Sequence, residues 1–169
     1  LPDYPLQEDL AVILDVVKNK HPSASHSVDP RKLEREIAQL DKLSGAALST
    51  EARWRQLATL NPVLADGHFF IGLPGWRDAT SQFLADGGKL FPFEVEFASG
   101  DRLTAISELG GGSSSYSGFE IRAINGVPTR KVVAELLKLV HGDTHVFRTA
   151  LLARRWWHYY RFVYGAPKS

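Results

Sequence analysis

The histidines carry the acid–base chemistry that this sequence offers, and His68 is the strongest candidate among them. It lies in the run LADGHFFIGL, residues 64 to 73, after the small Gly67 and before an apolar segment. That segment predicts a strand, and the imidazole would be exposed where the strand begins. Asp66 lies two positions before His68, so the pair could form a relay in which a carboxylate orients an imidazole that takes a proton from a serine. A structural role for His68 is the alternative, because histidine serves either role.

Other histidines are weaker candidates. His141 and His145 have the i, i+4 spacing that brings two imidazoles to one metal on a helix. Gly142 interrupts that helix and no third ligand is evident, so we expect two solvated polar side chains and no metal. His21 and His26 lie in a loop rich in Pro and Ser, and we expect both at the surface.

The sequence offers no nucleophile of its own. It contains no Cys, which excludes disulfides, thiolate zinc sites and a cysteine nucleophile. Three consecutive serines, 113 to 115, lie in the glycine-rich loop GGGSSSYSG, without the strand-to-helix turn that exposes a catalytic serine. We therefore expect these serines to be loop residues, and we expect no cofactor.

The run ARRWWHYYRFVYG, residues 153 to 165, combines three arginines with several aromatic rings, a composition that can bind single-stranded nucleic acid. The chain has 20 Lys and Arg against 19 Asp and Glu, so it lacks the broad basic groove that this role also needs. We expect no nucleic-acid partner. We expect the rings to pack against a part of the protein outside this chain, and to permit self-association without it. The apolar runs are too short to predict a membrane span.

Helices are expected to fill residues 1–66. Apolar spacing predicts a first helix near 6–19, and an Asp-Pro start predicts a second over about 30–42. A third begins after Ser49 and ends at Asn61-Pro62. These amphipathic helices must cover one another's apolar faces, so the sequence predicts a three-helix N-terminal domain.

In residues 67–169 the sequence pattern changes from helical spacing to patterns typical of strands, followed by further helices. FPFEVEF alternates apolar and charged residues as a half-buried strand does, and a turn at Gly100-Asp101 leads to the strand RLTAI. The run WRDATSQFLADGG fits either a short helix or an ordered loop. In GFEIRAINGVPTRKVVAELLKLV, a strand precedes a tight Asn125-Gly126 turn and a helix, and another helical pattern follows Gly142-Asp143. The predicted class is α+β, with a helical unit followed by a small mixed sheet and flanking helices.

The order of these parts resembles a known family. The I-x-x-I-N-G pattern before a helix resembles the end of a PDZ-like domain. Together with DLAVILDVVKNKHP, LDKLSGAALSTEARWRQLATLNPVLADGH and FPFEVEF, it resembles the front half of the tail-specific, or C-terminal processing, serine peptidases, on the branch that includes the tricorn core protease. The resemblance extends over nearly the whole chain, at the level of motif order.

That resemblance implies a helical cap over residues 1–66 and a PDZ-like domain over 67–169, which ends where the connection to a catalytic core begins. The core with its serine would lie outside this chain, which also lacks Met at position 1, so we expect an excised fragment that is inactive by itself. His68 matches the general base of the tricorn-like branch; in a branch with a serine–lysine dyad it would be structural. The implied localisation is periplasmic or secreted.

A peptide or protein substrate is the implied partner, because PDZ-like domains pair an extended peptide with a sheet edge. The predicted groove lies between a strand and a helix and is lined by Phe91, Phe93, Val95, Val132, Val133, Leu136 and Leu137. The alternative is a non-catalytic PDZ-like module that binds or scaffolds peptides with no peptidase core.

Overall fold

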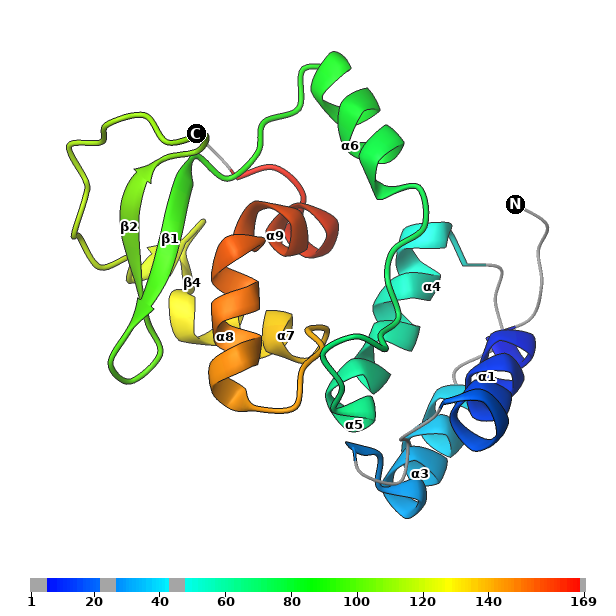
Figure 1. Cartoon of the computed structure of the whole chain (residues 1–169). Helices are drawn as coiled ribbons and strands as arrows, with labels where there is room; N and C mark the ends of the chain where they lie inside the picture. Colours follow the sequence, from blue (N-terminus) through cyan, green and yellow to red (C-terminus); the bar gives the residue numbers. More distant parts are fainter. Residues whose placement is uncertain (1–5, 22–26, 43–47, 168–169) are drawn as a thin grey trace. The chain divides into compact units, whose positions relative to one another are not determined.

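The computed structural model describes residues 6–21, 27–42 and 48–167 (Figure 1). The chain forms two compact units, the first of Leu1–Pro74 with Lys138–Thr144, the second of Gly75–Leu137 with His145–Ser169. Helices combine with two small antiparallel sheets, which confirms the predicted α+β class. The chain passes between the units after Pro74, later than the domain boundary predicted at residue 66, and it returns to the first unit for one short segment.

Helices make up the first unit, as predicted. Its elements in chain order are α1 (Leu6–Asp15), the π-helical turn η1 (Val16–Lys20), α3 (Pro30–Asp41), α4 (Thr50–Leu57), the 3-10 turn η2 (Ala58–Leu60) and α5 (Asn61–Leu64). The predicted caps are present: the carboxylate of Asp29 accepts the N–H groups of Arg31 and Lys32, and the hydroxyl of Ser49 accepts that of Ala52. The Asn61-Pro62 pair does not end the third helix region, because proline is tolerated in the first turn of α5.

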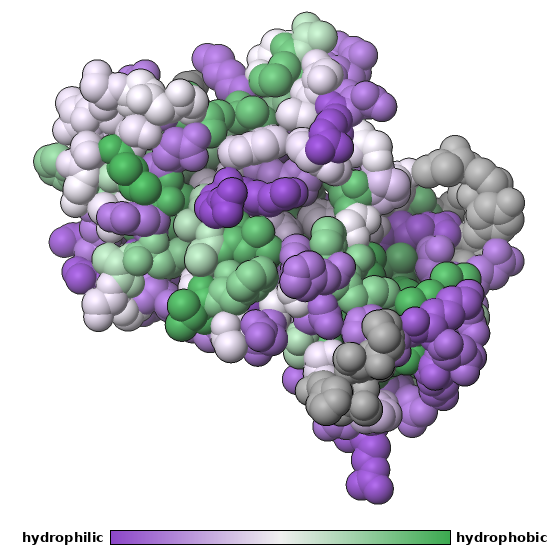
Figure 2. All heavy atoms as spheres, viewed as in Figure 1, coloured by the Kyte–Doolittle hydropathy of each residue, from purple (hydrophilic) through white to green (hydrophobic). Residues whose placement is uncertain are grey.

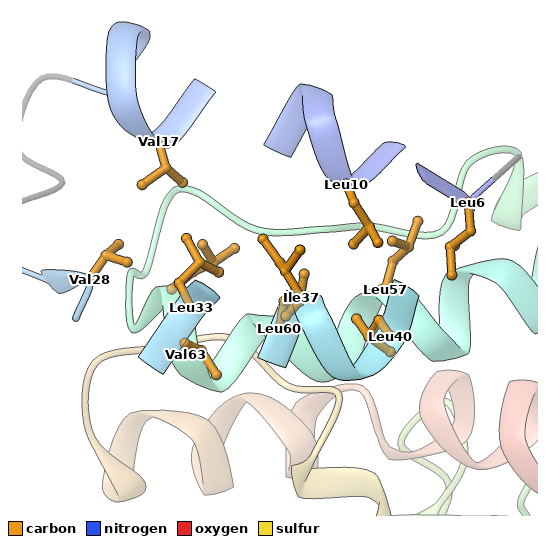
Figure 3. Close-up of a cluster of buried hydrophobic side chains, with 11 residues drawn as sticks. Leu6, Leu10, Val17, Val28, Leu33, Ile37, Leu40, Leu57, Leu60 and Val63 are labelled. Atoms are coloured by element: carbon orange, nitrogen blue, oxygen red, sulfur yellow. The ribbon is translucent and has the colours of Figure 1, made fainter. Parts of the chain in front are cut away.

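One apolar cluster holds these helices together (Figure 3). Its buried members come from every helix of the unit and from Val28: Leu6, Leu10, Val17, Val28, Leu33, Ile37, Leu40, Leu57, Leu60, Val63 and Leu64. Each fully buried aliphatic side chain contributes about 1.5–3 kcal/mol. The helical spacing read from the sequence therefore corresponds to the core of this unit.

The run HFFIGL is not a strand, which corrects the sequence-based prediction. It is an irregular segment, and side chains hydrogen-bond its backbone where a neighbouring strand would otherwise do so. Asn61 Oδ1 accepts the N–H of Ile71 at 2.7 Å, and Asn61 Nδ2 donates to the carbonyls of Ile71 at 3.1 Å and Leu139 at 2.8 Å. A buried amide thus satisfies the backbone groups that a sheet would otherwise pair.

Two antiparallel hairpins lie in the second unit. β1 (Phe93–Ala98) pairs with β2 (Arg102–Glu108), and β3 (Ala123–Ile124) pairs with β4 (Val127–Pro128). Both predicted turns are present, with positive φ at Gly100 and Asp101 and at Asn125 and Gly126. The predicted strand EIRAI is shorter than expected, since only its last two residues belong to β3 and Glu120 forms an isolated bridge with Thr104.

Four helices accompany these hairpins: α6 (Trp76–Ala85), α7 (Thr129–Leu137), α8 (His145–Arg154) and α9 (Trp156–Tyr164). The ambiguous run after Pro74 is thus helical. The closing aromatic run forms α9, and its rings recur at helical spacing and fill the core of this unit. Trp156 contacts Phe91 and Phe97, with ring centroids 5.8 and 6.5 Å apart. The expectation that these rings pack outside the chain is wrong for the buried ones.

The surface seen in Figure 2 mixes hydrophilic and hydrophobic residues, and neither class dominates this face. Among the residues that the structure describes, no helix has both the length and the apolar character needed to cross a bilayer.

Candidate functional site

The carboxylate of Asp66 does not orient the ring of His68. Its Oδ1 accepts the backbone N–H groups of His68 at 2.7 Å and Phe69 at 2.9 Å, and the His68 side chain is exposed. These two backbone hydrogen bonds, that of His68 first, hold the pKa of Asp66 below its ordinary value of 3.8. Asp66 therefore stabilises the turn that contains His68 by binding backbone N–H groups, and it does not contact the His68 ring.

The imidazole beside Asp66 is that of His21. Its Nε2 lies 3.4 Å from Asp66 Oδ2, with only 12% of the His21 side chain and 21% of the Asp66 side chain exposed. The Phe69 ring lies against His21, with centroids 5.0 Å apart. The prediction that His21 is a surface residue is wrong, because its partners lie far away in the sequence. The carboxylate of Asp66 thus lies at ion-pair distance from the ring of His21, and not from that of His68.

Of the two histidines expected to be solvated, His145 is exposed as predicted and His141 is not. His141 is buried and stacks on Phe70 at 3.9 Å, within the first unit. His145 is exposed in the second unit, so the i, i+4 spacing leads to two separate environments. His26 lies outside the described residues. In the part of the chain that the structure describes, no three metal-ligating side chains gather at one point.

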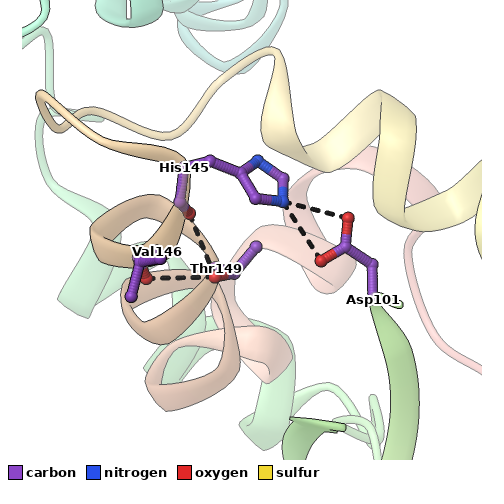
Figure 4. A network of polar contacts seen from close by, with 4 residues as sticks. All are labelled: Asp101, His145, Val146 and Thr149. Atoms are coloured by element: carbon purple, nitrogen blue, oxygen red, sulfur yellow. Dashed lines mark hydrogen bonds and ion pairs between the residues drawn. The ribbon is translucent and has the colours of Figure 1, made fainter. Parts of the chain in front are cut away.

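His145 forms the second histidine–aspartate pair of the chain (Figure 4). Its Nε2 lies 3.1 and 3.0 Å from the two carboxylate oxygens of Asp101, at the tip of the β1–β2 hairpin. The hydroxyl of Thr149 donates within α8 to the carbonyls of His145 and Val146. About half of each charged side chain is exposed, 52% for His145 and 49% for Asp101, so solvent weakens this pair.

The residues predicted to line a peptide groove lie mainly in the core of the second unit. Five of them are buried: Phe91, Val95, Val132, Val133 and Leu136. Phe93 and Leu137 are half-buried, and Phe93 contacts the exposed ring of Tyr116, with centroids 5.8 Å apart. Helix α7 packs against β3, β4, α8 and α9, whereas the helix with the most extensive packing against β1 is α8.

One edge of β1, which we call its open edge, has no strand partner within the described residues, although Val95 on this edge is buried. β2 is paired on both sides: with β1, and with the segment 118–121, through hydrogen bonds at Leu103 and Ala105. Thr104 between them therefore faces β1, where its partner is Glu96. It follows that the backbone groups of Val95 and Phe97 point away from β2, and the described residues place no third strand there.

Sequence reasoning missed both histidine–aspartate pairs. The pairs join residues from distant segments, and no local spacing indicates them. The unpaired edge, in contrast, belongs to the strand that the resemblance implies as one wall of the peptide groove. Comparisons of this chain with protein-family models, with curated proteins and with solved structures found no match.

Proposed function

We propose that this chain is the peptide-recognition part of a serine peptidase of the tail-specific type, with a helical cap and a PDZ-like domain, and that it is inactive by itself. The observation that carries the proposal is the open edge of β1 with α8 packed against the same strand. A sheet edge with outward N–H and C=O groups is what an extended peptide needs to add a strand. The peptidase activity of the whole protein and its periplasmic or secreted location are proposed from the resemblance in motif order.

Main-chain pairing would supply most of the affinity, and the half-buried Phe93 is a candidate side-chain contact. Phe93 leads to two exposed rings, Tyr116 and Phe119, whose centroids lie 6.3 Å apart. An apolar peptide side chain could cover these rings. The five buried residues of the predicted groove would then belong to the core that supports β1. The peptide itself would contact β1 and the rings beside it.

His68 stays the candidate general base of the whole enzyme. It is exposed and carried on a turn fixed by Asp66, so a separate core could approach it. Its orienting carboxylate would have to come from elsewhere, because Asp66 already binds two backbone N–H groups and His21. In the full-length protein, His68→Ala should abolish turnover and leave peptide binding intact; unchanged turnover would remove His68 from the catalytic residues.

Binding of a peptide library with free C-termini to the 169-residue chain tests recognition. The best binder is then N-methylated at alternate amides. Since pairing with β1 uses every second amide, methylation of one alternating set should weaken binding at least tenfold, while the other set serves as the control. Equal losses for both sets, or no binder at all, would contradict strand addition at β1.

The alternative function is a non-catalytic PDZ-like module that holds or scaffolds a partner. The same open edge supports it. The two differ in what accompanies the chain: a peptidase needs a core of roughly 100–200 residues that carries a serine at a strand-to-helix turn. Peptide binding without turnover by the full-length protein would favour the module.

A further inference from the structure

A pocket of about 380 Å³ lies within the second unit, on the opposite side of β2 from the open edge of β1. Three segments form it: the β1–β2 turn with the start of β2, the segment 120–122, and the start of α7 with Pro128 before it. Ile121 donates its N–H to the carbonyl of Leu103, which holds two of these segments together. The volume is within the range of small-ligand sites.

Three arginines line this pocket: Arg102, Arg122 and Arg130. Arg102 lies 3.8 Å from a Glu120 carboxylate oxygen, so part of its charge is neutralised. Arg122 and Arg130 form no ion pair with any residue in the described ranges 6–21, 27–42 and 48–167. Two guanidinium groups thus lie at one pocket with their charges uncompensated.

Thr129 adds an uncompensated hydroxyl at the same place. The residue lines the pocket, is only 5% exposed, and its Oγ1 has no hydrogen-bond partner among the residues that the structure describes. Its backbone N–H is used, since it donates to the carbonyl of Arg122 at 2.9 Å. A buried hydroxyl without a partner costs roughly 1–3 kcal/mol of desolvation, and a ligand oxygen would recover this once the Thr129 side chain rotates to present its hydroxyl to the pocket.

We propose that this pocket binds a carboxylate group. Arginine presents paired N–H donors that match a carboxylate, the hydroxyl of Thr129 supplies another donor, and the start of α7 favours negative charge. The lining carries three arginines against Asp101 and Glu120, a net charge of +1 that matches one carboxylate. A phosphate dianion would leave excess negative charge beside those two acids. This site goes beyond the proposed function, because β2 separates it from the edge of β1.

The test is an NMR titration of the 169-residue chain with N-acetyl-glycylglycine, with the amide of that peptide, with acetate and with inorganic phosphate, at constant ionic strength. The free acid should shift the backbone signals of Arg122, Thr129 and Arg130, and the amide should not. Tighter binding of the peptide than of acetate would identify a peptide C-terminus as the source of the carboxylate. Equal binding of the two would identify a small acid.

Variants sharpen the assignment. The double change Arg122→Gln with Arg130→Gln should weaken binding of N-acetyl-glycylglycine at least tenfold, while Arg154→Gln, an exposed arginine on α8, should leave it unchanged. Thr129→Val should weaken binding about two- to fivefold without lowering the thermal midpoint, because it removes only an unpaired hydroxyl. Equal binding of acid and amide, tighter binding of phosphate, or an equal loss with Arg154→Gln would each overturn the proposal.

Discussion

The two units each contain a histidine–aspartate pair, and the pairs are built in opposite ways. The pair of His21 and Asp66 is largely enclosed, and Asp66 also binds two backbone N–H groups. The pair of His145 and Asp101 joins a turn tip to the start of α8, with about half of each side chain in solvent. The enclosed pair has the longer contact, 3.4 Å against 3.0 Å, so contact distance alone does not decide which pair matters more for stability.

The difference lies in what each aspartate holds besides the histidine. Asp66 organises the irregular segment that follows α5, and that segment has no sheet to bond its backbone. Asp101 adopts a positive φ of 57° in a turn whose strands are already paired. We therefore infer that the pair of His21 and Asp66 contributes to the stability of the first unit. The pair of His145 and Asp101 contributes little to the stability of the second.

The largest expected effect concerns Asn61, which anchors the segment that Asp66 begins. Replacement Asn61→Ala removes three hydrogen bonds, two to the partly buried backbone of Ile71 and one to the buried carbonyl of Leu139, while Trp54 Nε1 still donates to the Ile71 carbonyl. The expected loss is about 3–5 kcal/mol of the free energy of unfolding of the first unit. Hydrogen exchange of the backbone amides of the first unit, followed at increasing urea concentration, measures this free energy of unfolding.

A matched control is Asn19→Ala, since Asn19 is exposed and bonds only locally to Asp15, four positions earlier. It should cost less than about 0.5 kcal/mol. If Asn61→Ala costs no more than this control, the polar anchoring of the segment is unimportant, and the contrast between the two pairs loses its basis.

His158 tests the effect of burying an imidazole in the second unit. Burial is the main cause that lowers its pKa from 6.5 to about 4, and the charges of Arg155 and Arg161 act in the same direction. Above pH 6.5 both states are neutral; as the pH falls toward 4, the unfolded chain binds a proton that the folded chain does not. The second unit should therefore lose about 3 kcal/mol between these limits, a loss that the linkage of protonation to folding requires.

Comparison of His158→Phe with the exposed His68→Gln checks this. The free energy of unfolding of the second unit, measured at pH 7 and pH 4.5, should lose most of its pH dependence in His158→Phe alone. A slope unchanged by His158→Phe would mean that another group titrates.

Much of the fold was predictable because its signals are local. The caps at Asp29 and Ser49 and the Asn125-Gly126 turn act within a few residues, and each is where the sequence predicts it. The failures were at HFFIGL, which was predicted as a strand, and at the aromatic run 153–165, whose rings were expected to pack outside the chain. Both depend on partners elsewhere in the sequence, the amide of Asn61 in the first case and rings such as Phe91 in the second.

The candidate sites were less predictable for the same reason. Asp66 was recognised, but its histidine was assigned by proximity in sequence, and the histidine beside it in space is His21. The three arginines of the pocket are spread over separate segments and form no motif. Local sequence indicates which residues can do chemistry, and tertiary structure decides which of them meet.

The smallest effects come from the pairs themselves. Asp66→Asn keeps an oxygen for the N–H groups of His68 and Phe69 and loses only the charge, whereas Asp66→Ala loses both. We expect losses of about 1 kcal/mol and about 1–3 kcal/mol of unfolding free energy, respectively, and less than about 0.5 kcal/mol for Asp101→Asn, which tolerates the positive φ.

The pH dependence separates the pairs further. Because its pKa is lowered, Asp66 contributes stability that is fully present above pH 3.8 and is lost as the pH falls through the folded-state pKa. Urea denaturation between pH 5 and pH 2.5 should therefore show a smaller loss for Asp66→Asn than for the unmodified chain. Equal effects of the asparagine changes at Asp66 and Asp101 would mean that enclosure does not strengthen the first pair, and that the two histidine–aspartate pairs differ in position alone.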